Sequence, residues 1–516
     1  MALVLTGTVV TFDGEARVLR PGRLYIGDDG KLAAVARPSD PAPAGFSAAR
    51  RLEVDGVIYP GLVDLHSHMA YNTLPLWEAP RVPYLHHDRW VDEKNPPDYA
   101  STITWPARVL QSAAPEALLK YVEVKALVGG TTALQGAPST TRPVDGWLVR
   151  VVDKERFGSD RDRVRSSALQ KRVEQLRGDA KKLRDEAGVL IYHVAEGPAG
   201  SIVHREFIDL DTAGCLRPGL IGVHATALGE ADFDLWQSAV TQADATQRAT
   251  IVWSPFSNLW LYQETTDVVA AHAKKLRIAL GSDWSPSGTK HVLGELKVAD
   301  LLNKRRFDRL FTNAELCEMV TANPGDALSP AGGQLGRLQA GAEADVIVVE
   351  RHHQNLHRNL IQATERHIQL VLIRGQPHYG TPELMKAAGA SRPNAITIRG
   401  QKRSVLVRMP GRTDATLSWP GVLRALAAVR ADPVGSYRTA VEALAAWGGP
   451  LDAPDAPLVL FGDMPEGDVG VLGATGEIPV DTTIPPLDTL EHDAAFFAAL
   501  DRAAPPELPR LVGYYP

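Results

Sequence analysis

Four short apolar runs of this chain end in histidine or aspartate. They cover residues 57–66, 188–193, 219–224 and 276–283. None alternates between apolar and polar positions, and each is followed by turn residues and then a helical pattern, which is typical of strands buried in a parallel sheet. The pattern predicts that the polar residues at or just after the run ends lie at the C-terminal ends of parallel strands. These residues are His66, His68, His193, His224 and Asp283.

The spacing of the runs indicates the architecture. His193 and His224 are 31 positions apart, and His224 and Asp283 are 59 apart, which is close to one and two βα units. A further apolar run at residues 249–254 supplies the strand needed between them. The whole span suits an eight-stranded (β/α) barrel, whose sites lie at the C-terminal strand ends. We therefore predict an α/β fold built on a TIM-like (β/α)8 barrel.

One part of the predicted barrel is less regular. Residues 131–135 and 147–152 are apolar enough to form two strands, but a further strand is needed before His193 and has no clear counterpart. The segment at residues 156–186 is densely charged, and the simplest interpretation is a solvated helix face.

His66 and His68 are separated by one serine at a strand end. Side chains of a strand alternate between its faces, so residues i and i+2 can bind one ion. On its own, such a pair is usually just a partly exposed strand end. The other run ends favour a metal site, because they supply the additional ligands that one ion needs.

The same motifs resemble those of a known family. From about residue 3 to 380 the sequence resembles the amidohydrolase superfamily, and within it the branch of cytosine deaminase and triazine hydrolase. The resemblance implies a metal-dependent hydrolase and leaves the substrate open. The motifs that carry it are PGLVDLHSH (60–68), GGTT (129–132), HVAE (193–196), His224, GSD (281–283) and TANP (321–324).

The resemblance also implies a discontinuous organisation. The flanks, residues 1–59 and 329–400, are expected to pair into one small β-sandwich, with the barrel at residues 60–328. Residues 401–516 depart from the family pattern and form a C-terminal extension. Apolar residues recur with helical spacing at 421–429 and 437–447. The extension is structural or part of a dimer interface, or it covers the barrel mouth or a partner subunit.

The implied ligand set consists of three imidazoles and one carboxylate. By the resemblance, His66, His68, His193 and Asp283 bind one divalent ion, and Asp283 also accepts a proton from water. This donor set suits Zn²⁺, with Fe²⁺ as the second choice. Such an ion lowers the pKa of bound water toward about 7. A second ion would need a bridging group, and Lys154 lies in charged surroundings typical of a surface residue, so we predict one ion.

Three further polar residues accompany these ligands. Glu196 corresponds, in the resembled mononuclear deaminases, to a carboxylate that carries a proton from water to the substrate nitrogen. His224 is open to three interpretations. It donates a hydrogen bond to the substrate or tetrahedral intermediate, which we favour, or it binds the metal, or it is only a packed histidine. Asp64 either supports the ligands or is purely structural.

Substrate contacts are expected from a long insertion after the first strand, residues 69–109. A loop of this length is usually functional, and its aromatic and cationic side chains suit a planar, nitrogen-rich or carbonyl-bearing ligand. Each of them can also simply pack the loop onto the barrel. The candidates are Trp77, His86, His87 and Trp90 in the insertion, together with Trp253, Ser254, Asn258 and Trp284 after later strands.

Composition agrees with a large soluble enzyme, and the resemblance implies a small-molecule substrate. The chain of 516 residues is 44% hydrophobic, enough for substantial cores, and its net charge of −6 gives no basic face for nucleic acid. No apolar run approaches the roughly 20 residues that span a membrane. The start lacks a signal-peptide pattern, so we expect a cytoplasmic protein. Two cysteines exclude a disulfide framework. The resemblance suggests a homodimer.

The sequence favours one class of reaction. We predict that a metal-activated water hydrolyses a C–N bond at an sp² carbon, in deamination of an aminated heterocycle or in hydrolysis of an amide or cyclic amide. The alternative is the same nucleophile acting on another leaving group, either a halide or a peptide-like bond of a tailoring pathway. A non-catalytic scaffold is disfavoured, because it needs neither a metal site nor a proton-transfer residue.

Overall fold

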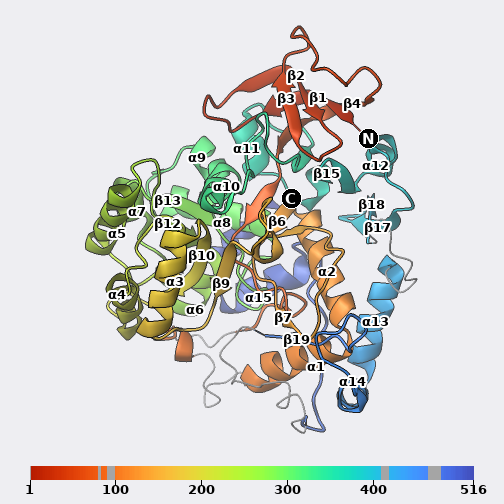
Figure 1. Cartoon of the computed structure of the whole chain (residues 1–516). Helices are drawn as coiled ribbons and strands as arrows, with labels where there is room; N and C mark the ends of the chain where they lie inside the picture. Colours follow the sequence, from red (N-terminus) through yellow and green to blue (C-terminus); the bar gives the residue numbers. More distant parts are fainter. Residues whose placement is uncertain (1, 79–82, 90–98, 408–417, 463–477, 516) are drawn as a thin grey trace.

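The computed structural model describes residues 2–78, 83–89, 99–407, 418–462 and 478–515. Within these ranges, parallel strands and surrounding helices form one part of the molecule, and a mixed sheet that contains the N-terminal strands forms another (Figure 1). The predicted α/β class is confirmed. None of the helices in these ranges is long and apolar enough to cross a lipid bilayer.

Eight parallel strands in the described part of the chain carry the predicted ligands or lie beside them. Five form a sheet in the order β13-β12-β11-β10-β9, and three form a sheet in the order β5-β6-β8. A bridge between Ser67 and Asp283 joins the two sheets next to the predicted ligands. The strands are β5 (Leu62–Asp64), β6 (Thr131–Leu134), β8 (Arg150–Val151), β9 (Val164–Ser167), β10 (Val189–Val194), β11 (Leu220–His224), β12 (Thr250–Trp253) and β13 (Arg277–Leu280).

Strand β9 is the one that the sequence pattern did not reveal. It lies within the charged segment 156–186, so the interpretation of this whole segment as a helix face is wrong for its first half. Only Val164 of β9 is buried, and the arginines around it conceal the strand pattern. The second half does form a helix, α3 (Val173–Asp185).

Alternating side chains separate two layers of core along the parallel strands. In β10, Val189 and Ile191 join an inner apolar cluster, whereas Leu190 and Tyr192 join the larger cluster beneath the helices. The inner cluster is a packed core and not a pore, so the strand ends rest on a solid support.

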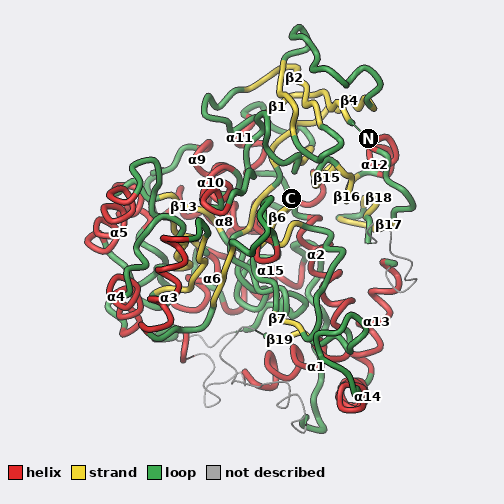
Figure 2. Tube along the Cα trace, viewed as in Figure 1, coloured by secondary structure: helices red, strands yellow, loops and turns green. Residues whose placement is uncertain are grey.

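Helices surround the parallel strands (Figure 2). They are α1 (Trp105–Ala113), α2 (Pro115–Val128), α3, α4 (Arg205–Thr212), α5 (Glu230–Ala243), α6 (Pro255–Tyr262), α7 (Val268–Ala273), α8 (Val292–Arg305), α9 (Asn313–Glu318) and α10 (Ala322–Ala327).

The two flanks of the barrel region share one nine-stranded mixed sheet. Strand β4 pairs with β14 in antiparallel register, with Pro60 opposite Val346. The flanks therefore pair as expected, although the sheet continues to Val405, and a separate sandwich domain stays a prediction. The sheet order is β17-β18-β16-β15-β14-β4-β1-β2-β3. The strands are β1 (Leu3–Val10), β2 (Val18–Ile26), β3 (Leu32–Ala36), β4 (Arg50–Pro60), β14 (Val346–Val349), β15 (Ile368–Ile373), β16 (Gln376–Gly380), β17 (Asn394–Ile398) and β18 (Gln401–Val405), with helices α11 (Leu356–Ile361) and α12 (Pro382–Ala388) between them.

The C-terminal extension packs on the barrel helices. The two helices predicted there are present as α13 (Trp419–Ala431) and α14 (Pro433–Ala446). Helix α13 contacts α2, and α14 contacts α1 (Figure 1). Strand β19 (Leu460–Phe461) pairs with β7 (Ser139–Thr140), and helix α15 (Ala494–Ala503) follows near the end of the chain.

Candidate metal centre and active site

Four of the predicted ligands converge at the C-terminal strand ends. Nε2 of His66 lies 3.1 Å from Nε2 of His68 and 3.1 Å from Nε2 of His193. Oδ1 of Asp283 lies 3.3 Å from Nε2 of His66 and 3.4 Å from Nε2 of His68. Bonds of about 2.0–2.1 Å to a tetrahedral ion place its ligand atoms about 3.3 Å apart. The distances around His66 suit such an ion. The ligand atoms of His66, His68 and Asp283 all lie within 4.8 Å of one another, and so do those of His66, His193 and His224.

The hydrogen bond of His66 shows which of its nitrogens faces the other ligands as an acceptor. Its Nδ1 lies 2.8 Å from Oγ of Ser254. If Nδ1 carries the proton and donates it to this hydroxyl, Nε2 presents a lone pair toward His68 and His193. Burial and the neighbouring imidazoles lower the pKa of His66 well below its usual value, which keeps the ring neutral. Converging lone pairs beside a carboxylate fit a divalent cation.

Asp64 lies behind the ligands and joins two of the segments that carry them. Its carboxylate accepts hydrogen bonds from the backbone N–H groups of His66 (3.2 Å) and Ser282 (3.1 Å). The hydroxyl of Ser282 donates a third, 2.5 Å long. Because Ser282 directly precedes Asp283, Asp64 fixes the end of β5 against the end of β13. Asp64 was expected either to support the ligands or to be purely structural, and these hydrogen bonds favour the first role.

Glu196 is buried next to the ligand group. The hydroxyl of Tyr262 donates to its Oε1 over 2.8 Å, and its Oε2 lies 3.7 Å from Nε2 of His224. Burial raises the pKa of Glu196 to about 7, although the charge of His87 opposes this. A carboxyl group that titrates near neutrality can both take up and release a proton.

His224 ends β11 with an unusual backbone. Its φ is 65° and that of Ala225 is 53°, in the left-handed region that non-glycine residues seldom occupy. The ring centroids of His224 and His66 are 4.6 Å apart. The amide of Asn258 donates to Nδ1 of His224 over 3.1 Å, so Nε2 carries the proton. This tautomer favours His224 as a hydrogen-bond donor over His224 as a metal ligand.

A cavity of about 250 Å³ opens over the ligand group. Within it His87 is held by Glu206, whose Oε1 lies 2.9 Å from Nε2 of the ring. Burial disfavours the charged ring, but hydrogen bonds to Asp88 and Glu206 outweigh this and raise the pKa of His87 to about 10. His87 therefore presents a positive charge to the cavity at neutral pH. Its lining residues are His68, His87, Asp88, Ala168, Leu169, Gln170, His193, Glu196, His224 and Asp283.

The tryptophans expected after later strands are not among the residues that line this cavity. Trp253 is fully buried on the outer side of β12, because Val252 takes the inner position. Its indole N–H donates to the hydroxyl of Thr265 over 2.7 Å. Trp284 is also fully buried and donates from its backbone N–H to Oδ1 of Asp283 over 2.8 Å. It supports a ligand from behind.

The insertion contributes His87 to the cavity, but its other candidates lie elsewhere. Trp77 is buried in the core, with its ring stacked on that of Tyr84 at a centroid distance of 6.0 Å. His86 packs beside His87 and is absent from the lining. Trp90 lies outside the described residues.

Several residues gain their roles only from the three-dimensional structure. Ser254 and Asn258 were expected to line the barrel mouth. In the structure Ser254 contacts His66 and Asn258 contacts His224, and these contacts between distant parts of the sequence have no local pattern. Tyr262 was not a candidate, because a tyrosine in an apolar helix looks like a core residue. Leu169 and Gln170 follow β9, the strand that the pattern concealed.

Comparison with known proteins identifies the family. A sequence profile described as the amidohydrolase family matches residues 200–377. The chain is also 28% identical over 402 residues to the 5-methylthioadenosine/S-adenosylhomocysteine deaminase of Syntrophobacter fumaroxidans, covering 67% of this chain and 84% of that protein. The profile match places residues 200–377 in the amidohydrolase family. The relatives named as deaminases support hydrolysis of a carbon–nitrogen bond other than a peptide bond, the reaction class that the resemblance implied.

Solved structures show the same fold as this amidohydrolase. A variant of the atrazine chlorohydrolase of Arthrobacter aurescens, in complex with zinc and atraton, aligns with a TM-score of 0.56 and 18% identity over 73% of this chain and 94% of its own. An adenosine deaminase from Xanthomonas campestris with bound zinc aligns with a TM-score of 0.55 and 19% identity over 73% and 92%.

Proposed function

We propose that this amidohydrolase is a mononuclear metal-dependent deaminase, which releases ammonia from an amino-substituted nitrogen heterocycle. The observation that carries the proposal is the pairing of Glu196 with His224 at the edge of the ligand group. One is a buried carboxyl group that titrates near neutrality, and the other presents an N–H donor to the same cavity. Relatives named as deaminases support this choice over hydrolysis of an amide.

Four residues would hold the ion: His66, His68, His193 and Asp283. Zinc is the favoured metal, because neutral imidazoles with one carboxylate suit it and because two proteins of the same fold contain it. When bound, a zinc ion lowers the pKa of a coordinated water toward about 7 and so supplies a nucleophile at neutral pH.

The protein's own side chains then move the protons. Glu196 donates a proton to the ring nitrogen next to the amino-bearing carbon, which makes that carbon electrophilic. Asp283 accepts a proton from the attacking water. The Nε2–H group of His224 donates a hydrogen bond to the oxygen that becomes the carbonyl. The proton held by Asp283 passes to the amino group, and Glu196 takes the remaining proton of the added hydroxyl group. The C–N bond breaks, ammonia leaves, and the ring carbonyl forms with Glu196 protonated again.

The test is ammonium release by zinc-loaded protein from a panel of adenine, adenosine, 5-methylthioadenosine, guanine, melamine and simple amides. The Asp283→Asn protein serves as the blank. Release above this blank from an aminated ring supports the proposal. Release from amides alone would reassign the protein as an amide hydrolase, and chloride release from a chlorinated triazine without ammonium would reassign it as a dehalogenase.

A further inference from the structure

The C-terminal extension places a buried carboxylate beneath the active site. Nζ of Lys125 donates to Oδ2 of Asp488 over 2.9 Å, and Nζ of Lys290 donates to Oδ1. All three side chains are buried. The backbone N–H of Asp488 donates to the carbonyl of Thr73 (2.9 Å), and the backbone carbonyl of Asp488 accepts a hydrogen bond from the hydroxyl of Tyr121 (2.6 Å). The extension is thus joined to the barrel by buried charge as well as by apolar packing.

Lys125 links Asp488 to the loop that follows β5. Its Nζ also donates to the carbonyl of Asn72 over 2.5 Å. The amide of Asn72 in turn donates to Oγ of Ser67, the residue between the first two ligands, over 2.9 Å. Its Oδ1 accepts the backbone N–H of Ser285 over 2.8 Å. Asn72 therefore holds the loop of His66 and His68 against the loop of Asp283.

Lys290 reaches the same carboxylate from the other ligand loop. It lies between Asp283 and the start of α8, on the segment that also contains Ser285. One oxygen of Asp488 faces each lysine. A single side chain of the extension therefore bridges the two loops that carry three of the four ligands.

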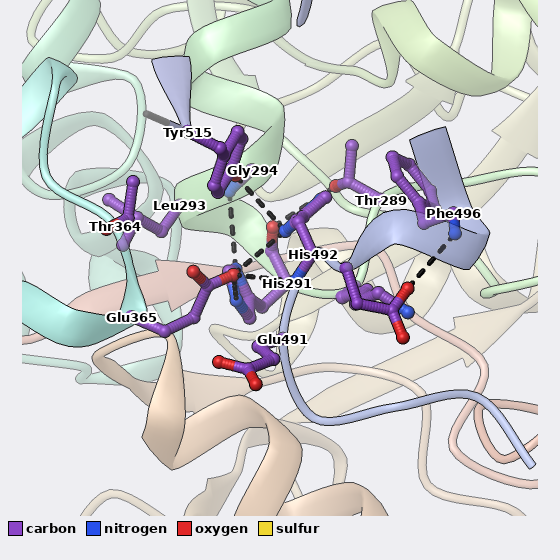
Figure 3. Close-up of polar contacts among 12 residues, drawn as sticks. Thr289, His291, Leu293, Gly294, Thr364, Glu365, Glu491, His492, Phe496 and Tyr515 are labelled. Carbon is purple, nitrogen blue, oxygen red and sulfur yellow. Dashed lines mark hydrogen bonds and ion pairs between the residues drawn. The ribbon is translucent and has the colours of Figure 1, made fainter. Parts of the chain in front are cut away.

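His291, which follows Lys290, lies in a second polar contact with the extension, through Glu365 and His492 (Figure 3). Oε1 of Glu365 accepts hydrogen bonds from Nδ1 (2.9 Å) and the backbone N–H (3.1 Å) of His492, and it lies 3.2 Å from Nε2 of His291. Because Nδ1 of His291 accepts the N–H of Gly294 (3.3 Å), its Nε2 carries the proton and donates. This cluster contains donor types that a metal uses, but its hydrogen bonds define a second polar anchor.

We propose that Asp488 is a positioning residue of the metal centre, which sets the separation of the loops after β5 and β13. Without its charge, two buried ammonium groups face each other with no counter-ion between them. The two ammonium groups would move apart, and this would displace Asn72, which Lys125 contacts, and the loop that contains Ser285 and Lys290. The relevance to turnover rests on the proposed function, but the effect on ion binding does not.

The test measures zinc affinity by competition with a chromophoric chelator, which needs no substrate. Asp488→Asn keeps the size of the side chain and removes its charge. We expect zinc binding to weaken by about 10- to 100-fold, the range found when outer partners of metal ligands are removed. Adding Lys290→Met to this variant removes one of the two opposed charges, and we expect it to restore part of the affinity.

Asp493→Ala is the matched control. Asp493 accepts the N–H of Phe496 over 3.0 Å at the start of α15, so its loss weakens the same extension without removing the carboxylate that pairs with the two lysines. We expect a lower melting temperature and unchanged zinc affinity.

Zinc affinity of Asp488→Asn within about twofold of the unmodified protein would overturn the proposal, as would an equal loss in Asp493→Ala. If Asp488→Asn does not fold, Asp488→Glu takes its place. That change keeps the charge but lengthens the side chain, and folded protein with undiminished zinc affinity would again overturn the proposal. An unmodified protein that binds zinc but releases no ammonium would contradict the deaminase assignment and leave this test intact.

Discussion

The amide of Asn258 donates a hydrogen bond to Nδ1 of His224, over 3.1 Å. Asn258 belongs to α6, and the last residue of that helix, Tyr262, donates its hydroxyl to Glu196. One helix therefore sets the tautomer of the imidazole and the orientation of the carboxyl group. The two groups that handle protons in the proposed reaction share a common support.

Replacing Asn258 by alanine frees Nδ1 of His224 to carry the proton, and Nε2 then loses its hydrogen in part of the molecules. Removing a hydrogen-bond donor from a developing oxyanion lowers kcat by about 10²–10³. Because Asn258→Ala removes this donor in only part of the molecules, we expect kcat to fall less than that, but by at least about tenfold. The zinc content should not change. Steady-state kinetics together with metal analysis measure both quantities. Loss of zinc in proportion to activity would instead make His224 a ligand.

Replacing Glu196 by glutamine retains the acceptor for Tyr262 and removes the proton that the carboxyl group transfers. General acid catalysis of this kind contributes about 10²–10⁴-fold to the rate. We therefore expect kcat to fall by at least about 10² while zinc content and melting temperature stay near those of the unmodified protein. A Glu196→Gln enzyme that keeps its activity would remove this residue from the mechanism.

Replacing Ser254 by alanine removes the partner of Nδ1 of His66. Metal ligands lose about 10- to 100-fold in affinity when the group that orients them is removed. We expect weaker zinc binding and, at saturating zinc, a kcat close to normal. Ser257→Ala, in the helix that follows Ser254, is a useful comparison, because the Ser257 hydroxyl pairs with that of Ser287, 3.0 Å away, and not with a ligand. Equal zinc affinities for the two variants would contradict the assigned role.

The burial of His378 leads us to expect that the folded protein loses stability at acidic pH. It is buried in β16, its Nδ1 has no hydrogen-bond partner within the described residues, and burial lowers its pKa to about 4. The unfolded chain takes up this proton near pH 6.5, and the folded protein only near pH 4. Stability from this group is therefore complete above pH 6.5 and falls as the pH drops toward 4, by about 2 kcal/mol between pH 7 and pH 5.

Urea unfolding at pH 7 and pH 5 measures this effect. We expect His378→Phe to lose about 2 kcal/mol less than the unmodified protein over the same interval, because phenylalanine does not titrate. The other buried histidines are common to both proteins and cancel in the comparison. Equal losses in the two proteins would show that His378 does not titrate in this range.

The convergence of the predicted ligands at one edge of the parallel strands follows from the sequence, for a physical reason. Parallel strands buried on both faces are continuous apolar runs, and their C-terminal ends meet at one edge. His66, His193 and Asp283 each mark such an end, so their convergence follows from local sequence. Strand β9 has one buried residue and no such run, and it was missed together with the cavity residues that follow it.

Other features depend on contacts that no local pattern encodes. The tautomer of His224 depends on a helix that begins 31 positions later, and the ring is presented by a backbone conformation that histidine seldom adopts. Lys125 and Asp488 are 363 positions apart. Trp253 was expected at the cavity, but it lies on the other side of its strand, because the register of alternation is fixed by packing.

The order in which the ribosome makes these parts has a consequence for metal uptake. His66 and His68 emerge early, but β14, which pairs with the strand leading to them, appears 280 residues after His66, and Asp488 later still. The nascent chain thus displays two exposed imidazoles long before the lysines beneath them are neutralised. If Asp488 positions the two loops as proposed, a chain that ends before residue 488 would contain every predicted ligand and still bind zinc weakly.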